Sequence, residues 1–301
     1  ALSGWLIGGI LYDQARADAP RFFFNRITRI WIPYAVAIAL LYGAALLKRP
    51  ADFHWFEYLV HDTTFTHNLF LTPRDDVIHD DLPLEGAGNH FWSLAVEEQF
   101  YLVAPLIILF APFGRSLRLW TALAATAWIA GDYASIAFGV LAAFTQKRFG
   151  DWRLSPVAQI ATGAALLASG VAVLGFDWRF NQTAPIFAVS AVLLLARAGP
   201  KSRIGAWLGG VSYPFYLNHW IGLYAAHAVA RVGLLPEAGR PVASLLIGFA
   251  VSAALYRLVD ITVRERKAAF YSARVGRLSV ALAYGSIGFG VLFGLSLAAL
   301  R

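Results

Sequence analysis

The sequence predicts an all-α protein, a polytopic transmembrane helical bundle with about 8–10 membrane segments. Of its 301 residues, 58% are hydrophobic and only 14% are charged, whereas soluble domains carry about 25% charged residues. Mean hydropathy is +0.59, and the apolar residues fall in long blocks such as 156–176, long enough to cross a bilayer as one helix. This composition excludes disordered, fibrous and ordinary soluble proteins. The lack of Cys excludes thiolate chemistry.

Candidate membrane segments follow one another along the whole chain. Lys and Arg in short loops mark the cytoplasmic side of a membrane, so the arginine-rich segment 13–30 is expected in the cytoplasm. The acidic segment at about 48–91 is then an external loop. We predict one membrane-embedded domain over residues 1–301. The candidate spans are 1–12, 31–47, 92–113, 156–176, 183–198, 206–230, 242–263 and 279–299.

The stretch 119–145 is apolar, but it is too short for two full helices at 1.5 Å per residue. A single crossing would place basic residues of several later loops outside, whereas two crossings or a re-entrant loop place them all inside. We therefore predict two shortened or broken helices around Gly131-Asp132, buried among other helices, because non-helical backbone at this depth is tolerated only there. Cytoplasmic basic residues then account for the net charge of +7, and no nucleic-acid partner is expected.

The first residues are unusual. The sequence contains no Met, and Ala1 opens an apolar stretch that is too short to span a bilayer. This stretch also lacks the basic lead of a signal peptide. We expect the natural protein to have further residues before it.

Two adjacent carboxylates, Glu97 and Glu98, lie inside the span 92–113. Ionisable groups at that depth are costly unless they face a cavity or a partner. On a helix, Ser93, Glu97 and Tyr101 share one face, while Trp92 and Glu98 point elsewhere. Two explanations stay open at this point. The glutamates serve a reaction, or they snorkel to the interface or pair with an arginine.

Other polar residues allow a functional and a structural explanation. Arg26 and Arg29, at i and i+3, form a cationic face suited to phosphate, although basic residues flank membrane spans in any case. His219 lies in the apolar segment 209–224, where a satisfied core histidine is the commoner explanation. Histidines among the acids of the external loop match no standard metal pattern, so we expect a solvated acidic loop and no metal. These histidines are His54, His61, His67 and His79.

Several short motifs follow one another in a fixed order. WSLAVEEQFYLVAPL at 92–106 is the most specific; LSGWLI at 2–7 and Arg26-Ile-Thr-Arg29 precede it, and FGVLAA at 138–143 and VSYPFYLNHW at 211–220 follow it. In this combination the chain resembles the acyltransferase-3 family of integral-membrane acyltransferases. The resemblance covers nearly the whole chain.

The resemblance implies transfer of an acyl group, commonly acetyl, from cytoplasmic acyl-CoA to a hydroxyl of a carbohydrate or cell-envelope glycan. It implies a multi-pass protein of the bacterial cytoplasmic (inner) membrane, with acetyl-CoA as donor and the lipid bilayer as surroundings. By that resemblance, Arg26 and Arg29 hold the donor phosphates. The remaining candidates are Glu97, Glu98, His219 and His90 for catalysis, and Trp92, Ser93, Tyr101 and Tyr213 for substrate binding.

The chain also departs from the family pattern. The family begins with a helix that carries an arginine and a histidine regarded as catalytic, and that helix would precede LSGWLI. The family's late Glu-Lys-Pro element is represented here by Val259-Asp260-Ile261-Thr262. We therefore expect this chain by itself to be a truncated, inactive catalyst. A polytopic transporter and a non-catalytic acyltransferase-like membrane protein stay open as alternatives.

Overall fold

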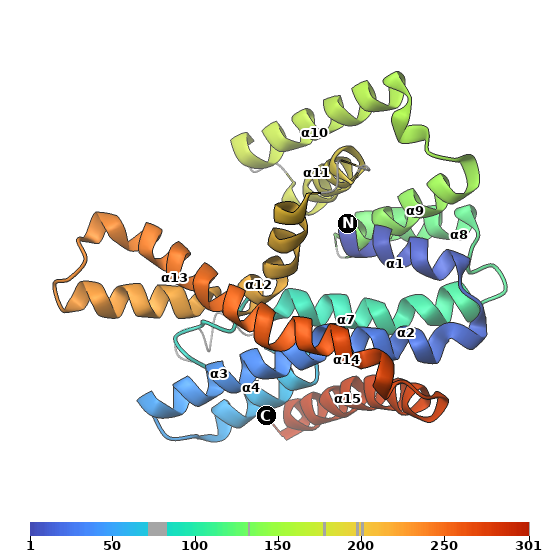
Figure 1. Ribbon diagram of the computed structural model, residues 1–301. Helices are drawn as coiled ribbons and strands as arrows, with labels where there is room; N and C mark the ends of the chain where they lie inside the picture. Colours follow the sequence, from blue (N-terminus) through green and yellow to red (C-terminus); the bar gives the residue numbers. More distant parts are fainter. Residues whose placement is uncertain (72–82, 132, 177–178, 197–198, 200–201, 301) are drawn as a thin grey trace. The chain divides into compact units, whose positions relative to one another are not determined.

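The computed structural model describes the chain except for residues 72–82, 132, 177–178, 197–198, 200–201 and 301 (Figure 1). Among the described residues, every regular element is a helix, which confirms the predicted fold class. The chain divides into two compact units. The first contains Ala1–Ala19 and Phe100–Pro200, and the second contains Pro20–Gln99 and Lys201–Arg301. A single domain over 1–301 stays a prediction.

Five helical stretches of the described residues are long and apolar enough to cross a membrane. They coincide with five of the predicted spans and confirm a multi-pass helical membrane protein. Their outer surfaces are strongly apolar: on one of them Val157 is 76% exposed and Leu174 is 84% exposed, as expected for side chains that face lipid rather than water. The stretches are Arg16–Lys48, Phe91–Phe110, Pro156–Gly175, Glu237–Phe270 and Ala273–Leu300.

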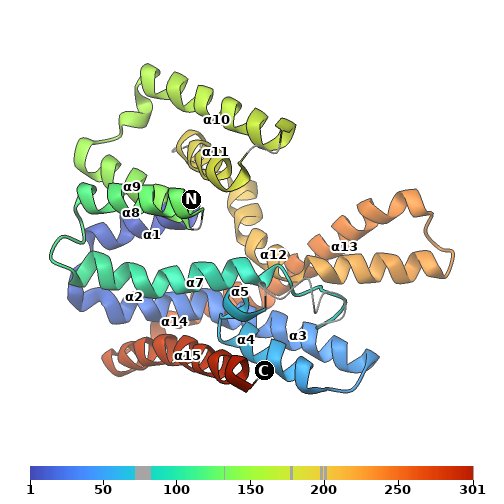
Figure 2. The same ribbon diagram turned by 180° about the vertical axis from the view of Figure 1, so that it is seen from behind.

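The first unit is built around the packing of α1 on α9, and α8 packs against α9 as well (Figure 1, Figure 2). α1 and α9 approach closely through glycines, as is common between membrane helices. A Cβ at Gly4 would overlap the Ile136 carbonyl, and a Cβ at Gly139 would overlap the Ala1 carbonyl. The elements are α1 (Leu2–Asp13), η1 (Arg16–Asp18), η4 (Leu106–Phe110), α8 (Leu117–Ala130), α9 (Ala134–Phe149), η5 (Trp152–Leu154), α10 (Pro156–Phe176) and α11 (Phe180–Leu195).

The stretch 119–145 forms two short helices, as predicted. α8 has 14 residues and α9 has 16, and α8 ends at Gly131, whose φ of 88° suits glycine. Asp132 lies outside the described residues. The prediction that both helices are buried is wrong for α8, because only one stripe of it, Trp120 and Ala124, faces the core. α9 is largely buried.

The second unit contains a long hairpin of α12 and α13, which lie side by side in both views (Figure 1, Figure 2). It also contains two turns of π-helix, η2 and η7, each set between two α-helices. Single π turns within α-helices are frequent at functional sites. The elements are α2 (Ala19–Arg26), η2 (Ile27–Trp31), α3 (Ile32–Lys48), α4 (Phe53–Thr63), α5 (His67–Phe70), α7 (Phe91–Pro105, up to Gln99), α12 (Arg203–Arg231), η6 (Glu237–Gly239), α13 (Arg240–Leu255), η7 (Tyr256–Ile261), α14 (Thr262–Phe270) and α15 (Ala273–Leu300).

Candidate active site

A cavity of about 270 Å³ lies in the second unit, with walls from η2, α12, η7 and α14. Three cations and one carboxylate line it, so its net formal charge is +2 when the carboxylate is ionised. The two π turns supply opposite charges, Arg29 from η2 and Asp260 from η7. The complete lining is Thr28, Arg29, Gly209, Gly210, Tyr213, Tyr256, Asp260, Val263, Arg264 and Lys267.

The basic wall of this cavity comes mainly from α14. Arg264 and Lys267 lie three residues apart on α14, which brings them onto one helical face, and Asp260 precedes them in the π turn η7. The Asp260 carboxylate is within electrostatic reach of both Arg29 and Arg264. Its Oδ2 atom is buried and has no hydrogen-bond partner among the described residues. The cavity therefore offers three cationic side chains for an anion and one carboxylate oxygen that can accept from an N–H or O–H group.

The two arginines of the predicted phosphate site have different surroundings. Arg29 lines the cavity, but Arg26 is absent from its lining. The Arg26 guanidinium lies 5.6 Å from the centroid of the Phe22 ring, and its charge acts on Glu98. The chain passes from α-helix to π-helix at Ile27, and the wider π turn changes the angle between positions i and i+3. The assumption of one shared α-helical face does not hold for this pair.

Glu98 lies on the buried face of α7, in a stripe with Phe91, Leu94 and Ala95. Its side chain is only 4% exposed, so it does not snorkel to an interface. Glu98 Oε2 accepts a hydrogen bond from Trp31 Nε1 at 2.7 Å. Glu98 Oε1 is buried without a hydrogen-bond partner among the described residues. A buried carboxylate oxygen without a partner is costly and is available to bind a donor group of a ligand.

Glu97 differs from its neighbour: it is partly exposed, and its charge acts on Tyr216 of α12. The two carboxylates therefore point to different surroundings, as predicted for residues one position apart on a helix.

A second polar group lies at the start of α7, where His90 meets His219 of α12. The centroids of the two imidazole rings are 4.8 Å apart. His219 Nδ1 donates to the Tyr216 carbonyl at 2.9 Å, which leaves Nε2 as its acceptor atom. Burial, and then the neighbouring His219, lower the pKa of His90 to about 4. His90 is therefore neutral at pH 7.

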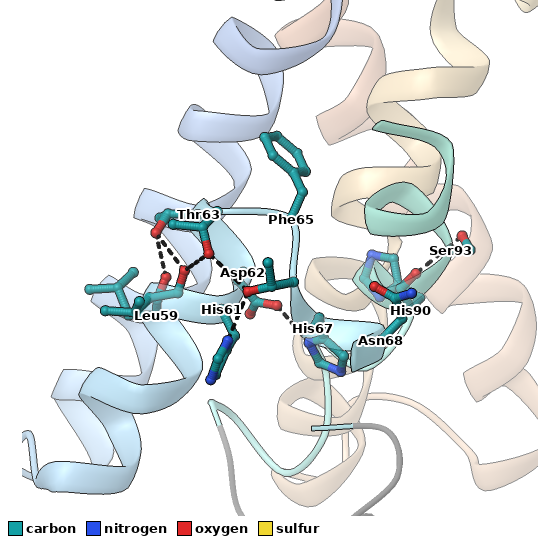
Figure 3. Close-up of polar contacts among 12 residues, drawn as sticks. Leu59, His61, Asp62, Thr63, Phe65, His67, Asn68, His90 and Ser93 are labelled. Atoms are coloured by element: carbon teal, nitrogen blue, oxygen red, sulfur yellow. Dashed lines mark hydrogen bonds and ion pairs between the residues drawn. The ribbon is translucent and has the colours of Figure 1, made fainter. Parts of the chain in front are cut away.

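Ser93 and Tyr216 complete this second group. The two hydroxyl oxygens lie 2.7 Å apart with Ser93 as the donor, and Ser93 Oγ is also 3.3 Å from the His90 carbonyl oxygen (Figure 3). Tyr216 also donates to the His90 carbonyl. The sequence analysis did not single out Tyr216, although it lies between two of its candidates in VSYPFYLNHW.

Tyr213 joins the cavity to Glu98. It lines the cavity, its hydroxyl donates to the Ile30 carbonyl at 3.1 Å, and the charges of both Glu98 and Asp260 act on its phenol. Tyr213 and Tyr216 are three residues apart, so they lie on neighbouring turns of one face of α12. The second unit therefore holds the basic cavity, the buried carboxylate of Glu98 within electrostatic reach of the cavity residue Tyr213, and the histidine pair on α12 and at the start of α7.

For two further predicted substrate-binding residues, Trp92 and Tyr101, the binding role stays a prediction. Trp92 is 47% exposed. Tyr101 is buried but belongs to the first unit. The residues that sequence reasoning missed are Trp31, Tyr216, Arg264 and Lys267. Arg264 and Lys267 are three residues apart, as are Arg26 and Arg29. This second basic pair could have indicated a phosphate site, but basic residues that flank a membrane span account for it equally well.

The prediction of a solvated acidic loop is wrong for the buried residues of α4 and α5, whereas the side chains of His54 and Glu85 are exposed as predicted, by 52% and 64%. His61, Asp62 and His67 are at most 2% exposed, and so is Glu57, because α4 and α5 fold this segment into the second unit (Figure 3). His79 lies outside the described residues. Within the described chain, no group of three or more His, Asp or Glu side chains is placed to hold a metal ion.

The fold and the site define a multi-pass helical membrane protein with a basic cavity backed by a buried carboxylate. The model of the acyltransferase-3 family, described as an acyltransferase domain, matches residues 1–257. The chain belongs to this acyltransferase family.

Two curated proteins are similar to this chain in sequence. A protein of Komagataeibacter xylinus named as a candidate membrane-bound transacylase, BcsY, is 29% identical over 232 residues, or 65% of this chain and 59% of the relative. An uncharacterized protein of Haemophilus influenzae is 30% identical over 115 residues, or 36% of this chain and 46% of the relative. The matches thus span about half the length of these relatives. No solved structure matches the chain significantly.

Proposed function

We propose that this membrane acyltransferase transfers an acyl group from cytoplasmic acyl-CoA to a hydroxyl of a carbohydrate or cell-envelope glycan. The proposed acyl group is acetyl. The proposed location is the bacterial inner membrane. The observation that carries the proposal is the cavity with a net formal charge of +2, whose lining residue Tyr213 is within electrostatic reach of the buried carboxylate of Glu98. The family membership supports the reaction class.

The charge of the cavity suits the donor. A phosphomonoester carries about −1.5 to −2 charges at pH 7, close to the opposite of the cavity's formal charge. Guanidinium groups of Arg29 and Arg264 offer planar paired donors for phosphate, and Lys267 adds a point charge. The partnerless Oδ2 atom of Asp260 can accept from an amine, amide or hydroxyl of the same ligand. We assign the donor nucleotide to this cavity, with Arg29 but not Arg26 among its ligands.

The proposed reaction needs a base and donors for an oxyanion. The acceptor oxygen bonds to the acyl carbon, the C–S bond breaks, and the proton lost by the hydroxyl is returned to the CoA sulfur. A base works best with a pKa near the working pH, so His90, with a pKa of about 4, is poorly suited at pH 7. We assign the proton acceptor to Glu98 Oε1. The hydroxyls of Tyr213 and Tyr216, which donate to the Ile30 and His90 carbonyls in the absence of substrate, would have to turn from those carbonyls to donate to the developing oxyanion.

The test uses the protein in proteoliposomes with radiolabelled acetyl-CoA and glycans extracted from cell envelopes. Replacement of a general base lowers transfer by about 10²- to 10⁴-fold, and we expect this loss for Glu98→Gln with the acetyl-CoA Kd unchanged. Glu265→Gln is the matched control, because Glu265 is an exposed residue of α14 outside the cavity lining. Full transfer by Glu98→Gln would refute the assignment. Solute uptake that needs no acyl-CoA would point instead to a transporter.

A further inference from the structure

A buried polar cluster occupies the turn from α4 to α5 in the second unit (Figure 3). Asp62, at its centre, is completely buried. One carboxylate oxygen contacts His67 Nδ1 at 2.7 Å, and the other accepts from the Tyr42 hydroxyl at 2.5 Å. The Asp62 carbonyl accepts from the Tyr34 hydroxyl at 3.0 Å. None of these residues lines the basic cavity, so donor binding does not account for the cluster.

The cluster holds a strained turn. Phe65 lies between Asp62 and His67 and has a φ of 56°, in the left-handed region that bulky residues rarely adopt. The Phe65 amide donates to the Asp62 carbonyl at 3.2 Å. The bond between the Asp62 and His67 side chains joins the residues before and after Phe65. Such strain persists only where the surroundings impose it. The pair therefore determines where the Phe65 ring and carbonyl point.

Phe65 contacts two residues that adjoin Glu98, namely Trp31 and Gln99. Its ring packs on the Trp31 indole, with centroids 4.9 Å apart, and Trp31 donates the hydrogen bond to Glu98. The Phe65 carbonyl accepts from Gln99 Nε2 at 2.8 Å, and Gln99 is the next residue after Glu98. Gln99 Nε2 also donates to Asn68 Oδ1 at 2.7 Å. The turn thus holds the indole that binds the carboxylate and the helix that carries it.

We propose that Asp62 and His67 are positioning residues for Glu98, acting through Phe65 and Trp31. The buried pair fixes the turn, the turn fixes the indole, and the indole orients Oε2 so that Oε1 is left for a ligand. The inference rests on the proposed function only in that Glu98 is the carboxylate the reaction uses. The physical linkage between the turn and Glu98 does not depend on it.

The test measures Glu98 directly and needs no acceptor. N,N′-dicyclohexylcarbodiimide modifies protonated carboxyl groups in apolar surroundings, and peptide mass spectrometry of the protein in proteoliposomes gives the extent at each site. Loss of one charge-assisted hydrogen bond favours the protonated form by about tenfold, so Trp31→Phe is expected to raise Glu98 labelling by that factor. Asp62→Asn and His67→Gln are expected to produce part of the same increase. Labelling of Asp260 in the same samples is expected to stay constant.

Ser252→Ala is the control for general loosening, because Ser252 is fully buried on α13 and its hydroxyl donates within that helix, to the Gly248 carbonyl. Should Asp62→Asn fail to fold, Tyr42→Phe removes a single hydrogen bond from the same carboxylate. Increased labelling in Trp31→Phe but not in any turn variant would overturn the proposal. An equal increase at Asp260 or in Ser252→Ala would also overturn it.

The outcomes separate this inference from the proposed function. If the wild-type protein binds no acetyl-CoA, the proposed donor is wrong, while the labelling pattern still decides the positioning role. If transfer is observed, the turn variants are expected to lower kcat with the KM for acetyl-CoA unchanged, since the cluster lies outside the donor cavity. An increase in KM alone would contradict positioning.

Discussion

The imidazole rings of His90 and His219 lie with their centroids 4.8 Å apart, one at the start of α7 and the other on α12. Two protonated imidazoles at this separation would repel each other in a site that offers little water. The pair is therefore stable only while at least one ring is neutral. Burial, and then the neighbouring His219, lower the pKa of His90 to about 4, so this ring is neutral at pH 7.

The first prediction concerns stability at low pH. An unfolded chain protonates His90 near pH 6.5, whereas the folded protein holds it neutral down to about pH 4. The unfolded state therefore binds more protons in this window, and His90 makes the protein less stable as pH falls from 6.5 to 4, by at most about 3 kcal/mol. His90→Gln is expected to lose this part of the dependence. Melting temperatures of both proteins in detergent between pH 4 and 7 test it, and parallel curves would contradict it.

The second prediction concerns the binding of the acetyl-CoA phosphates by the cationic side chains of the cavity. Arg264→Gln and Lys267→Gln each remove one charge-assisted donor, so we expect the acetyl-CoA Kd to rise by about 10- to 100-fold. Each variant is also expected to show a smaller preference for acetyl-CoA over its 3′-dephospho form. Arg277→Gln, an exposed residue of α15 outside the cavity lining, serves as the control. Titration calorimetry at two salt concentrations provides the measurement. Equal affinity of the wild type for both donors would exclude a phosphomonoester site.

The third prediction uses two adjacent glycines of the cavity wall. A Cβ at Gly210 would overlap the end of the Tyr256 side chain, whereas a Cβ at Gly209 would meet nothing within 4 Å. Because the obstructing atoms are the end of a side chain, Gly210→Ala displaces the Tyr256 ring rather than the helix. We expect Gly210→Ala to weaken acetyl-CoA binding and Gly209→Ala to leave it unchanged. Similar Kd values for both variants would show that Tyr256 has no part in the binding wall.

The sequence was sufficient to predict the helical membrane fold, because the thickness of the bilayer sets the length of an apolar helix that crosses it. It also located the short α8 and α9 helices, since charge placement and length constrained 119–145. It could not separate Arg26 from Arg29, because the pattern of hydrophobic and basic residues at 26–31 predicts an ordinary α-helix and does not indicate the π turn of η2. Nor could the sequence predict that Asp62 and His67 are buried, because acidic and histidine-rich composition suggests exposure to solvent. Their burial depends on the hydrogen bond between them and on the bond from Tyr42 to Asp62, which only the fold brings together.

The fourth prediction concerns the hairpin that carries Tyr213, Tyr216 and His219. A Cβ at Gly222 of α12 would overlap the Ser244 carbonyl and the Gly248 backbone of α13, so α12 and α13 would have to move apart. Overpacking of this kind costs about 1–3 kcal/mol, more than the gain of up to about 1 kcal/mol from replacing a helical glycine by alanine. Gly222→Ala is therefore expected to lower the melting temperature in detergent. Gly285→Ala on α15, where a Cβ meets nothing within 4 Å, is expected to retain or raise it. If both variants melt alike, close backbone packing does not hold α12 against α13.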